Sequence, residues 1–228
     1  MMLKTLFDRL AETYDQDIID SDNRDLFPFA GYQKIMDFIA SDIEKQSHLG
    51  RCRILDLGIG TGNLEAKIKP ERIELTGVDL SEKMLEVAQL KLPGATLYCA
   101  DFLQGLPPEI QNDKFDFILS TYALHHLDFP AWMEYITYLS QHLTVFGKIY
   151  IGDILFLTES EKRACQIEHT REWDEDEYYH VYEQIASQIC EHLAASFVKV
   201  SFCGGIVILE NYHECTLHHP EMKITIHR

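Results

Sequence analysis

Glycine occupies every second position in part of the segment ILDLGIGTGN, residues 54–63. Glycine adds chain entropy and removes packing area, so it is costly inside a regular helix or strand. A plain strand–helix turn would need only one glycine, whereas this segment has Gly58, Gly60 and Gly62. The spacing therefore predicts a loop whose backbone amides come close to a bound cofactor.

Two aspartates and a phenylalanine add to this pattern. The dinucleotide fingerprint G-x-G-x-x-G would need glycine where this chain has Asn63, and the observed pattern G-x-G-x-G follows Asp56. Asp79 ends the segment LTGVD, where a carboxylate can accept both hydroxyls of an adenosine ribose. Asp101 and Phe102, in CADF, would take an adenine amino group and pack on its ring. These residues indicate an adenosine-containing ligand.

Two adjacent histidines are candidates for proton transfer. His125 and His126 follow a predicted strand, and an imidazole can accept a proton near neutral pH. No metal site is predicted, because the histidine pairs 125–126 and 218–219 lack zinc-like spacing with cysteine. The acidic run 174–177 is typical of a solvated helix start rather than a calcium loop.

Short apolar runs alternate with helical patterns in the first two thirds of the chain. Strands are predicted at 52–57, 73–79, 95–100, 115–120 and 147–153. Helices are predicted at 62–69, 81–92 and 130–143, the second capped by Ser81. This alternation is typical of an α/β fold with a doubly wound, mostly parallel sheet.

The pattern changes after residue 154. A polar, acidic stretch at 156–180 leads into a helix predicted to run to about residue 195. Two strand-like runs, SFVKVSF and GIVILENY, then flank the pair Gly204–Gly205, which favours an antiparallel hairpin.

Composition limits the partners of the chain. The 228 residues include 37 acidic and 20 basic side chains, a formal charge of −17. Such a field repels nucleic acid and anionic membranes, and favours a neutral or cationic small-molecule substrate. No apolar run approaches the ~20 residues of a membrane helix. Six scattered cysteines without an export signal indicate a cytoplasmic protein. The oligomeric state is not predicted.

From Ile54 to about Asp153 the chain resembles the class I S-adenosylmethionine-dependent methyltransferases. The motifs that carry the resemblance occur in order: LDLGIGTGN, VDLSEKML, ADF, FDFILSTYALHHL and GKIYIGD. With its A-x-x-YDQ opening and LHHL segment, the chain is similar to uncharacterised bacterial small-molecule methyltransferases. The resemblance implies a Rossmann-like, seven-stranded sheet with a final antiparallel hairpin, and S-adenosylmethionine as cofactor.

The resemblance also implies residue roles. On the adenosine side, Asp79 would hold the ribose hydroxyls, and Asp101 would bond the adenine amino group. Leu80, Met84 and Phe102 would pack near the adenine.

On the methionine side, Asp56 and the Gly58–Gly62 loop would face the amino-acid half of the cofactor. Ser120 and Thr121 would close the sulfonium side, and Tyr14 would fold over the cofactor. His126 or His125 would act as the general base where the acceptor must lose a proton.

A single methyltransferase domain is predicted over 1–228. It comprises an N-terminal helical lid (1–50), a cofactor-binding core (51–155), and a helical insertion, hairpin and tail (156–228). The helical face with Leu3, Leu6, Phe7 and Leu10 is expected to pack on the tip of the sheet as a mobile lid. It would bring Tyr14 and His126 to the transferred methyl group.

Three functions are compatible with these patterns. The first is methyl transfer to a small-molecule acceptor. The second is a non-catalytic S-adenosylmethionine-binding module that acts through a partner. The third is a nicotinamide oxidoreductase, which the Asn63 mismatch disfavours.

Overall fold

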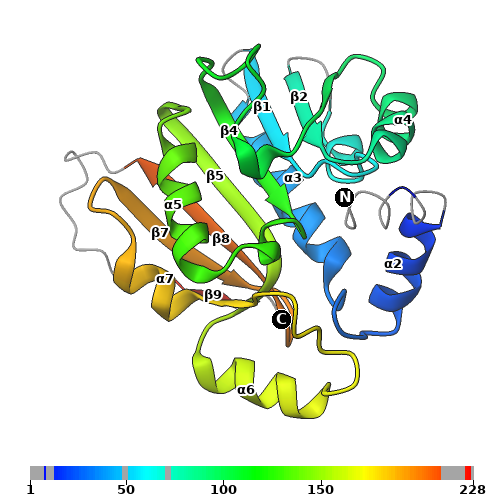
Figure 1. Cartoon of the computed structure of the whole chain (residues 1–228), viewed down its shortest axis with the longest axis vertical. Coiled ribbons are helices and arrows are strands. Elements are labelled where there is room, and N and C mark those ends of the chain that lie inside the picture. Colours follow the sequence, from blue (N-terminus) through cyan, green and yellow to red (C-terminus); the bar gives the residue numbers. More distant parts are fainter. Residues whose placement is uncertain (1–7, 9–12, 48–50, 70–72, 212–223, 227–228) are drawn as a thin grey trace.

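The computed structural model describes most of the chain (Figure 1). The described residues are 8, 13–47, 51–69, 73–211 and 224–226. The predicted apolar face with Leu3, Leu6, Phe7 and Leu10 lies outside them, as does most of the tail 213–228.

One twisted sheet organises the molecule, in the order β3-β2-β1-β4-β5-β8-β7-β9. Five strands are mutually parallel: β1 (Cys52–Leu57), β2 (Ile73–Asp79), β3 (Thr96–Cys99), β4 (Phe115–Thr121) and β5 (Leu143–Phe156). β8 (Gly204–Asn211) runs antiparallel to both β5 and β7 (Leu193–Lys199). These seven strands confirm the predicted fold, including the antiparallel hairpin.

Two short strands extend the predicted sheet. β9 (Ile224–Ile226) pairs in parallel with β7, and β6 (His180–Val181) pairs with the end of β5. By pairing with β5, β6 holds the end of the acidic stretch beside the carboxyl ends of the central strands.

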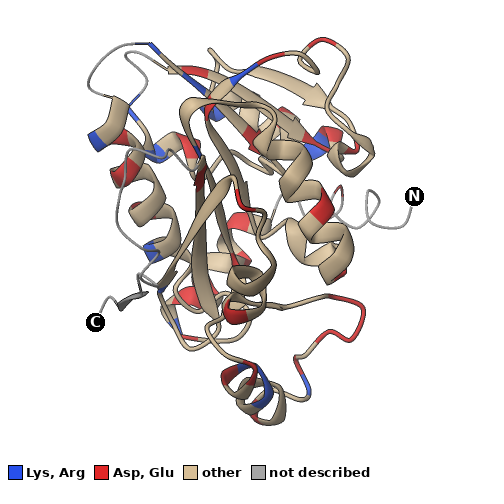
Figure 2. Cartoon of the chain, turned by 90° about the vertical axis from the view of Figure 1, so that its left-hand side faces the viewer, with Lys and Arg blue, Asp and Glu red and all other residues tan. Residues whose placement is uncertain are grey.

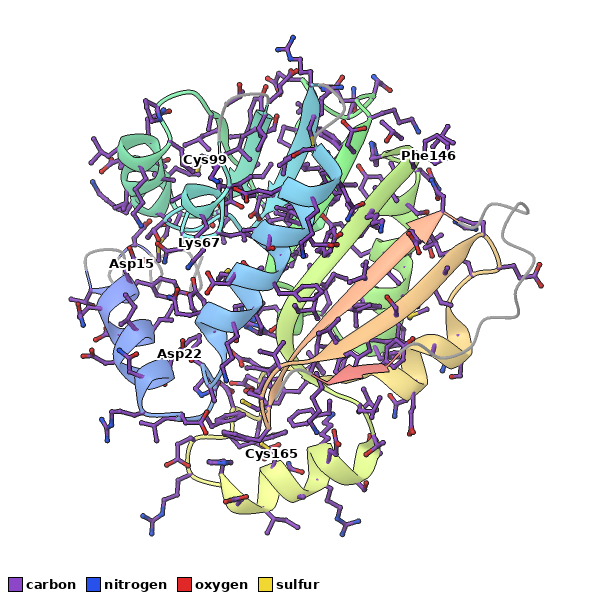
Figure 3. All side chains as sticks on the ribbon, turned by 180° about the vertical axis from the view of Figure 1, so that it is seen from behind. Asp15, Asp22, Lys67, Cys99, Phe146 and Cys165 are labelled. Atoms are coloured by element: carbon purple, nitrogen blue, oxygen red, sulfur yellow. The ribbon has the colours of Figure 1, made fainter. Side chains whose placement is uncertain are left out.

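Helices cover both faces of the sheet (Figures 1 and 3). α3 (Tyr32–Gln46) buries Ile35, Ile39 and Ile43, whose four-residue spacing places them on one face. This helix approaches β5 so closely that a β-carbon at Gly152 would collide with Ile35. α5 (Phe129–Ser140) lies on the opposite face, and its first turn is capped by Asp128.

The remaining helices are short. They are α2 (Tyr14–Asn23), α4 (Glu82–Lys91), α6 (Glu159–Glu168) and α7 (Tyr182–Gln188). Ser81 caps α4 as predicted, accepting a hydrogen bond from Met84 N at 3.2 Å. Among the described helices, none has both the length and the apolar character that crossing a bilayer requires.

Two helix predictions were wrong in extent. The predicted helix 62–69 is only one 3₁₀ turn, η2 (Glu65–Lys67), after which Ile68 is extended. Pro70 in the sequence disfavours helical conformation in the residue before it, so a helix is not expected to extend to residue 69. The helix predicted to run to about residue 195 is α7, which ends at Gln188 because Ile189 is no longer helical and β7 begins at Leu193. The acidic stretch before it contains a further helix, α6, and the run 174–177 lies in the connection to α7 rather than at a helix start.

Candidate functional site

The loop after β1 is tied to the tip of β2 by hydrogen bonds. Gly58 N donates to Val78 O at 2.8 Å, and Gly60 N donates to one oxygen of Asp79 at 2.8 Å. The other Asp79 oxygen accepts from Ser81 N at 2.8 Å. Burial raises the pKa of Asp79, against backbone hydrogen bonds that lower it. Asp79 therefore shapes the loop and also presents a carboxylate beside it.

The three glycines of the loop differ in what they face. All three have positive φ, but a β-carbon at Gly58 would lie 2.5 Å from Ala123, and one at Gly62 would lie 2.5 Å from Leu92. A β-carbon at Gly60 would meet only the Gly58 oxygen, at 4.0 Å. Protein packing therefore accounts for two of the glycines, and Gly60 is the one that opens onto free space.

That space is a cavity of about 980 Å³, including its open mouth, at the carboxyl ends of the parallel strands. The predicted residues that line it are Tyr14, Gly58, Gly60, Asp79, Leu80, Met84, Asp101, Phe102, Thr121 and His126. Ile59 and Thr61, inside the predicted Gly58–Gly62 loop, line it too, and the lining residues that were not predicted are Tyr32, Asn63, Leu64, Leu103, Tyr122 and Ala123. Asp56, Gly62, Ser120 and His125, which were predicted site residues, do not line it.

Asp56 lies buried with Glu65, away from the lining of the cavity. Asp56 is 1% exposed and Glu65 is 4% exposed. Among the described residues, no N–H or O–H group reaches Asp56 Oδ1 or either carboxylate oxygen of Glu65. Burial raises the pKa of both groups, and their mutual proximity raises that of Asp56 further. The geometry therefore fits two carboxyl groups that share one proton.

Ser120 and Gly62 have packing roles in this structure. Ser120 is buried, and its hydroxyl donates to Leu57 O at 2.9 Å, joining β4 to β1. Gly62 allows Leu92, at the end of α4, to pack against the loop. Both residues support the cavity from outside it.

The N-terminal helix α2 contacts the same loop. Asp15 accepts hydrogen bonds from Thr61 Oγ1 at 2.6 Å, Asn63 Nδ2 at 2.8 Å and Lys91 Nζ at 2.6 Å. Figure 3 shows Asp15 at the end of α2 that faces this part of the molecule. Burial raises the pKa of Asp15, but these three hydrogen bonds outweigh it and the net shift is downward. The contacts place the neighbouring Tyr14 in the cavity wall.

At the other end of the cavity, η5 (Leu124–His126) carries both candidate histidines. His125 Nδ1 lies 2.8 Å from an oxygen of Asp153, which is 3% exposed. Burial lowers the pKa of His125, but the Asp153 carboxylate more than compensates, so the net shift is upward. Burial, reinforced by His125, lowers the pKa of His126 to about 4. The two rings therefore have different protonation properties, and only His126 reaches the cavity.

Tyr122 is the most informative residue that sequence reasoning missed. It follows β4 with φ of +50°, which is rare for a tyrosine. Its ring lies 5.2 Å from Tyr32 and 5.4 Å from Phe29, between centroids. Its hydroxyl is buried, with no hydrogen-bond partner in the part of the chain that the structure describes. A strained backbone that directs an aromatic ring into the cavity wall favours a ligand-binding role.

Comparisons with known proteins agree with this geometry. A methyltransferase domain model matches residues 54–147. An uncharacterized methyltransferase of Geobacillus kaustophilus is 33% identical over 204 residues, covering 85% of this chain and 90% of that protein. One from Alkaliphilus oremlandii is 30% identical over 188 residues, covering 82% of each.

Solved structures show the same fold at low identity. An S-adenosylmethionine-dependent methyltransferase from Clostridium acetobutylicum has a TM-score of 0.63 and 19% identity, with 88% of this chain and 99% of that chain covered. The N-methyltransferase NodS from Bradyrhizobium japonicum, in complex with S-adenosylhomocysteine, has a TM-score of 0.61 and 15% identity, with 89% and 98% covered.

Proposed function

Because the chain belongs to the class I S-adenosylmethionine-dependent methyltransferases, we propose that it methylates a small-molecule acceptor, neutral or cationic, in the cavity described above. Family membership makes the chain an enzyme with S-adenosylmethionine as cofactor, and removes the nicotinamide alternative. The nature of the acceptor and the residue roles are the proposal.

The cavity wall fits this cofactor. The single observation that carries the assignment is Gly60, where a β-carbon would project into otherwise open space beside the Asp79 carboxylate. We assign the ribose hydroxyls to Asp79, and the adenine to the pocket of Leu80, Met84 and Phe102, with Asp101 near its amino group. Thr121 and Tyr14 would border the sulfonium side.

Three predicted residues take indirect roles in the proposal. Asp56, with Glu65, and Ser120 would support the loop and the strand tips rather than touch the cofactor. Gly62 would do so by admitting Leu92.

When bound, the cofactor supplies a methyl group already activated by the sulfonium charge. The residues of the chain must then hold the acceptor in line and exclude water. His126 lines the cavity and is neutral near pH 7, so its ring can accept a hydrogen bond from an acceptor O–H, N–H or S–H group. His125 would orient that segment through Asp153 without touching the acceptor.

Charge supports a neutral or cationic acceptor. The formal charge of the chain is −17, and the acidic run 174–177 lies in the loop beside α6 (Figure 2). Glu177 of this run lies 3.5 Å from His125. A phosphorylated acceptor would be repelled from this end of the cavity.

Thermal-shift measurements test the proposal. S-adenosylhomocysteine should stabilise the fold, by ~2.7 kcal/mol at a hundredfold excess over Kd, and NAD should not. A metabolite panel in the presence of S-adenosylhomocysteine should then give hits among neutral or cationic compounds. Stabilisation by NAD without any by S-adenosylhomocysteine would contradict the assignment of the cavity.

A further inference from the structure

We propose that His125, His126 and Glu177 form a binding site for one divalent transition-metal ion of the zinc type, at the acceptor end of the cavity. One potential ligand atom from each residue lies within 4.8 Å of those of the other two. Two imidazoles and one carboxylate are a donor set that zinc accepts in catalytic sites. The sequence spacing does not indicate this group, because Glu177 is far from the histidines along the chain.

Two of the three groups already have the separation that a metal requires. His125 Nε2 lies 3.5 Å from Glu177 Oε1. Tetrahedral zinc, with bonds of about 2.0–2.1 Å, places neighbouring ligand atoms about 3.3–3.4 Å apart. The His126 ring contacts that of His125 at 4.4 Å between centroids, and one of its nitrogens lies within 4.8 Å of the other two ligand atoms, so the third ligand is next to the other two.

The groups around His125 fix the orientation of its ring so that Nε2 faces Glu177. Asp153 Oδ1 accepts a hydrogen bond from Ile154 N at 2.8 Å, so it acts as an acceptor toward His125 Nδ1 as well. The Nδ1 proton is thereby fixed, and the lone pair of the neutral ring lies on Nε2, facing Glu177. A carboxylate that orients a histidine in this way is a regular feature of zinc sites. A cation between Nε2 and Glu177, either a proton on the ring or a metal ion, pairs with the carboxylates on both sides, and a bound metal ion would replace that proton.

Glu177 is held in the corresponding way. Its Oε2 accepts a hydrogen bond from the Tyr179 hydroxyl at 2.8 Å, while Oε1 faces His125. Tyr178 N donates to His125 O at 2.7 Å, joining the acidic segment to η5. The segment is therefore held against the histidines by a backbone contact, and the free carboxylate oxygen faces them.

Three protein ligands leave a fourth position of a tetrahedral ion for water or substrate. His126 lines the cavity, so this position would be reached from the cavity. The role of the ion rests on the proposed function: in place of a direct hydrogen bond from the acceptor to His126, the ion would bind a hydroxyl or thiol acceptor and lower the pKa of that group. The O–H or S–H proton passes to water, the lone pair of O or S bonds the methyl carbon, and the methyl–sulfonium bond breaks with its electron pair going to sulfur.

Metal binding can be measured without turnover. After exposure to Zn²⁺ alone and dialysis, the chain should retain about one ion, measured by elemental analysis. With Co²⁺ alone it should show a tetrahedral d–d spectrum without intense thiolate charge transfer, because no cysteine is in the donor set. Glu177→Gln and His126→Ala should each weaken binding at least about tenfold, and Asp153→Asn by about 10–100-fold.

Matched controls separate this site from adventitious binding. Glu175→Gln removes an exposed acid of the same run, and the double variant His218→Ala, His219→Ala removes a pair outside the described residues. Both should keep wild-type affinity. Wild-type affinity in Glu177→Gln and His126→Ala, or no retained metal in the wild type, would overturn the proposal.

The stabilisation by S-adenosylhomocysteine provides an independent check. It should persist in Glu177→Gln, in Asp153→Asn and in both control variants, which shows that these variants are folded. Its absence from the wild type would count against the proposed function, whatever the metal measurements give.

Discussion

The two ends of the cavity are formed by different kinds of chemical group. At one end, backbone amides, Gly60 and Asp79 come from two consecutive strand tips, and the carboxylate is tied to the loop by a 2.8 Å hydrogen bond. At the other end His126 lines the cavity, and behind it lie ionisable side chains from η5, β5 and the acidic connection between α6 and α7. The cofactor end therefore depends on backbone geometry, and the acceptor end depends on long-range packing of charged groups.

The largest expected effect is a loss of cofactor affinity that leaves the acceptor end of the cavity unchanged. Gly60→Val should reduce S-adenosylhomocysteine affinity by more than about a hundredfold, because its side chain would project into the cavity and a β-branched residue is strained at φ of +54°. Calorimetric titration measures the loss. Gly94→Val is the matched control, since no atom lies within 4 Å of its new β-carbon. Metal retention in Gly60→Val should be unchanged. An S-adenosylhomocysteine affinity of Gly60→Val within about threefold of the wild type would contradict the cofactor assignment.

Asp79→Ala tests the carboxylate at the same end. We expect a loss of ~2–4 kcal/mol in cofactor binding, from the charge-assisted bonds to the ribose and from loosening of Gly60. Asp101→Ala, at an exposed position, should cost about 1 kcal/mol or less. Titration of both variants gives the comparison. Equal losses would show that the ribose is misplaced in our assignment.

This contrast between the two ends also explains what the sequence could predict. The loop, Asp79, Asp101 and Phe102 follow successive strands, so their meeting at one edge follows from the parallel sheet. The fold was predictable for the same reason, because strand and helix patterns alternate locally.

The remaining site residues carry no comparable signal. The positive φ of Tyr122 comes from its tertiary setting, so it could not be predicted from the sequence. Glu177 meets His125 only because β6 and Tyr178 hold the acidic segment at the strand ends. The family resemblance implied that Asp56 faces the cofactor, but Asp56 is buried beside Glu65 and does not line the cavity.

A third prediction concerns α2, which is part of the predicted lid (1–50). Asp15→Asn should weaken S-adenosylhomocysteine binding about fivefold, since Asp15 is partly exposed and its three hydrogen bonds join α2 to the loop. Asp17→Asn, on an exposed position of α2, is the control and should bind normally.

Hydrogen exchange tests the lid itself. Residues 13–23 should gain protection when S-adenosylhomocysteine binds the wild type, and gain less in Asp15→Asn. Protection that does not change on binding would eliminate the lid, even if the affinity prediction holds.

The smallest effect is expected beneath the cofactor loop, at the buried pair Asp56 and Glu65. Burial raises both pKa values above those of the unfolded chain, so the folded state binds protons more tightly. The stabilisation from this proton is fully present below the unfolded values, near pH 4, and is lost as pH rises through the raised folded values.

Glu65→Gln should remove much of this pH dependence, because an amide N–H can donate to Asp56 without a titratable proton. The Tm of Glu65→Gln relative to the wild type should therefore rise as the pH increases from about 5, through the raised pKa values of the wild-type pair. The control is Glu74→Gln, at a more exposed position, where one partner of the Arg51 salt bridge is lost. Parallel Tm curves for Glu65→Gln and the wild type would show that no proton is shared between the two carboxyl groups. Because this pair lies under the loop and not among the histidines, a Tm difference should appear without any change in metal retention, which keeps the two ends of the cavity separable.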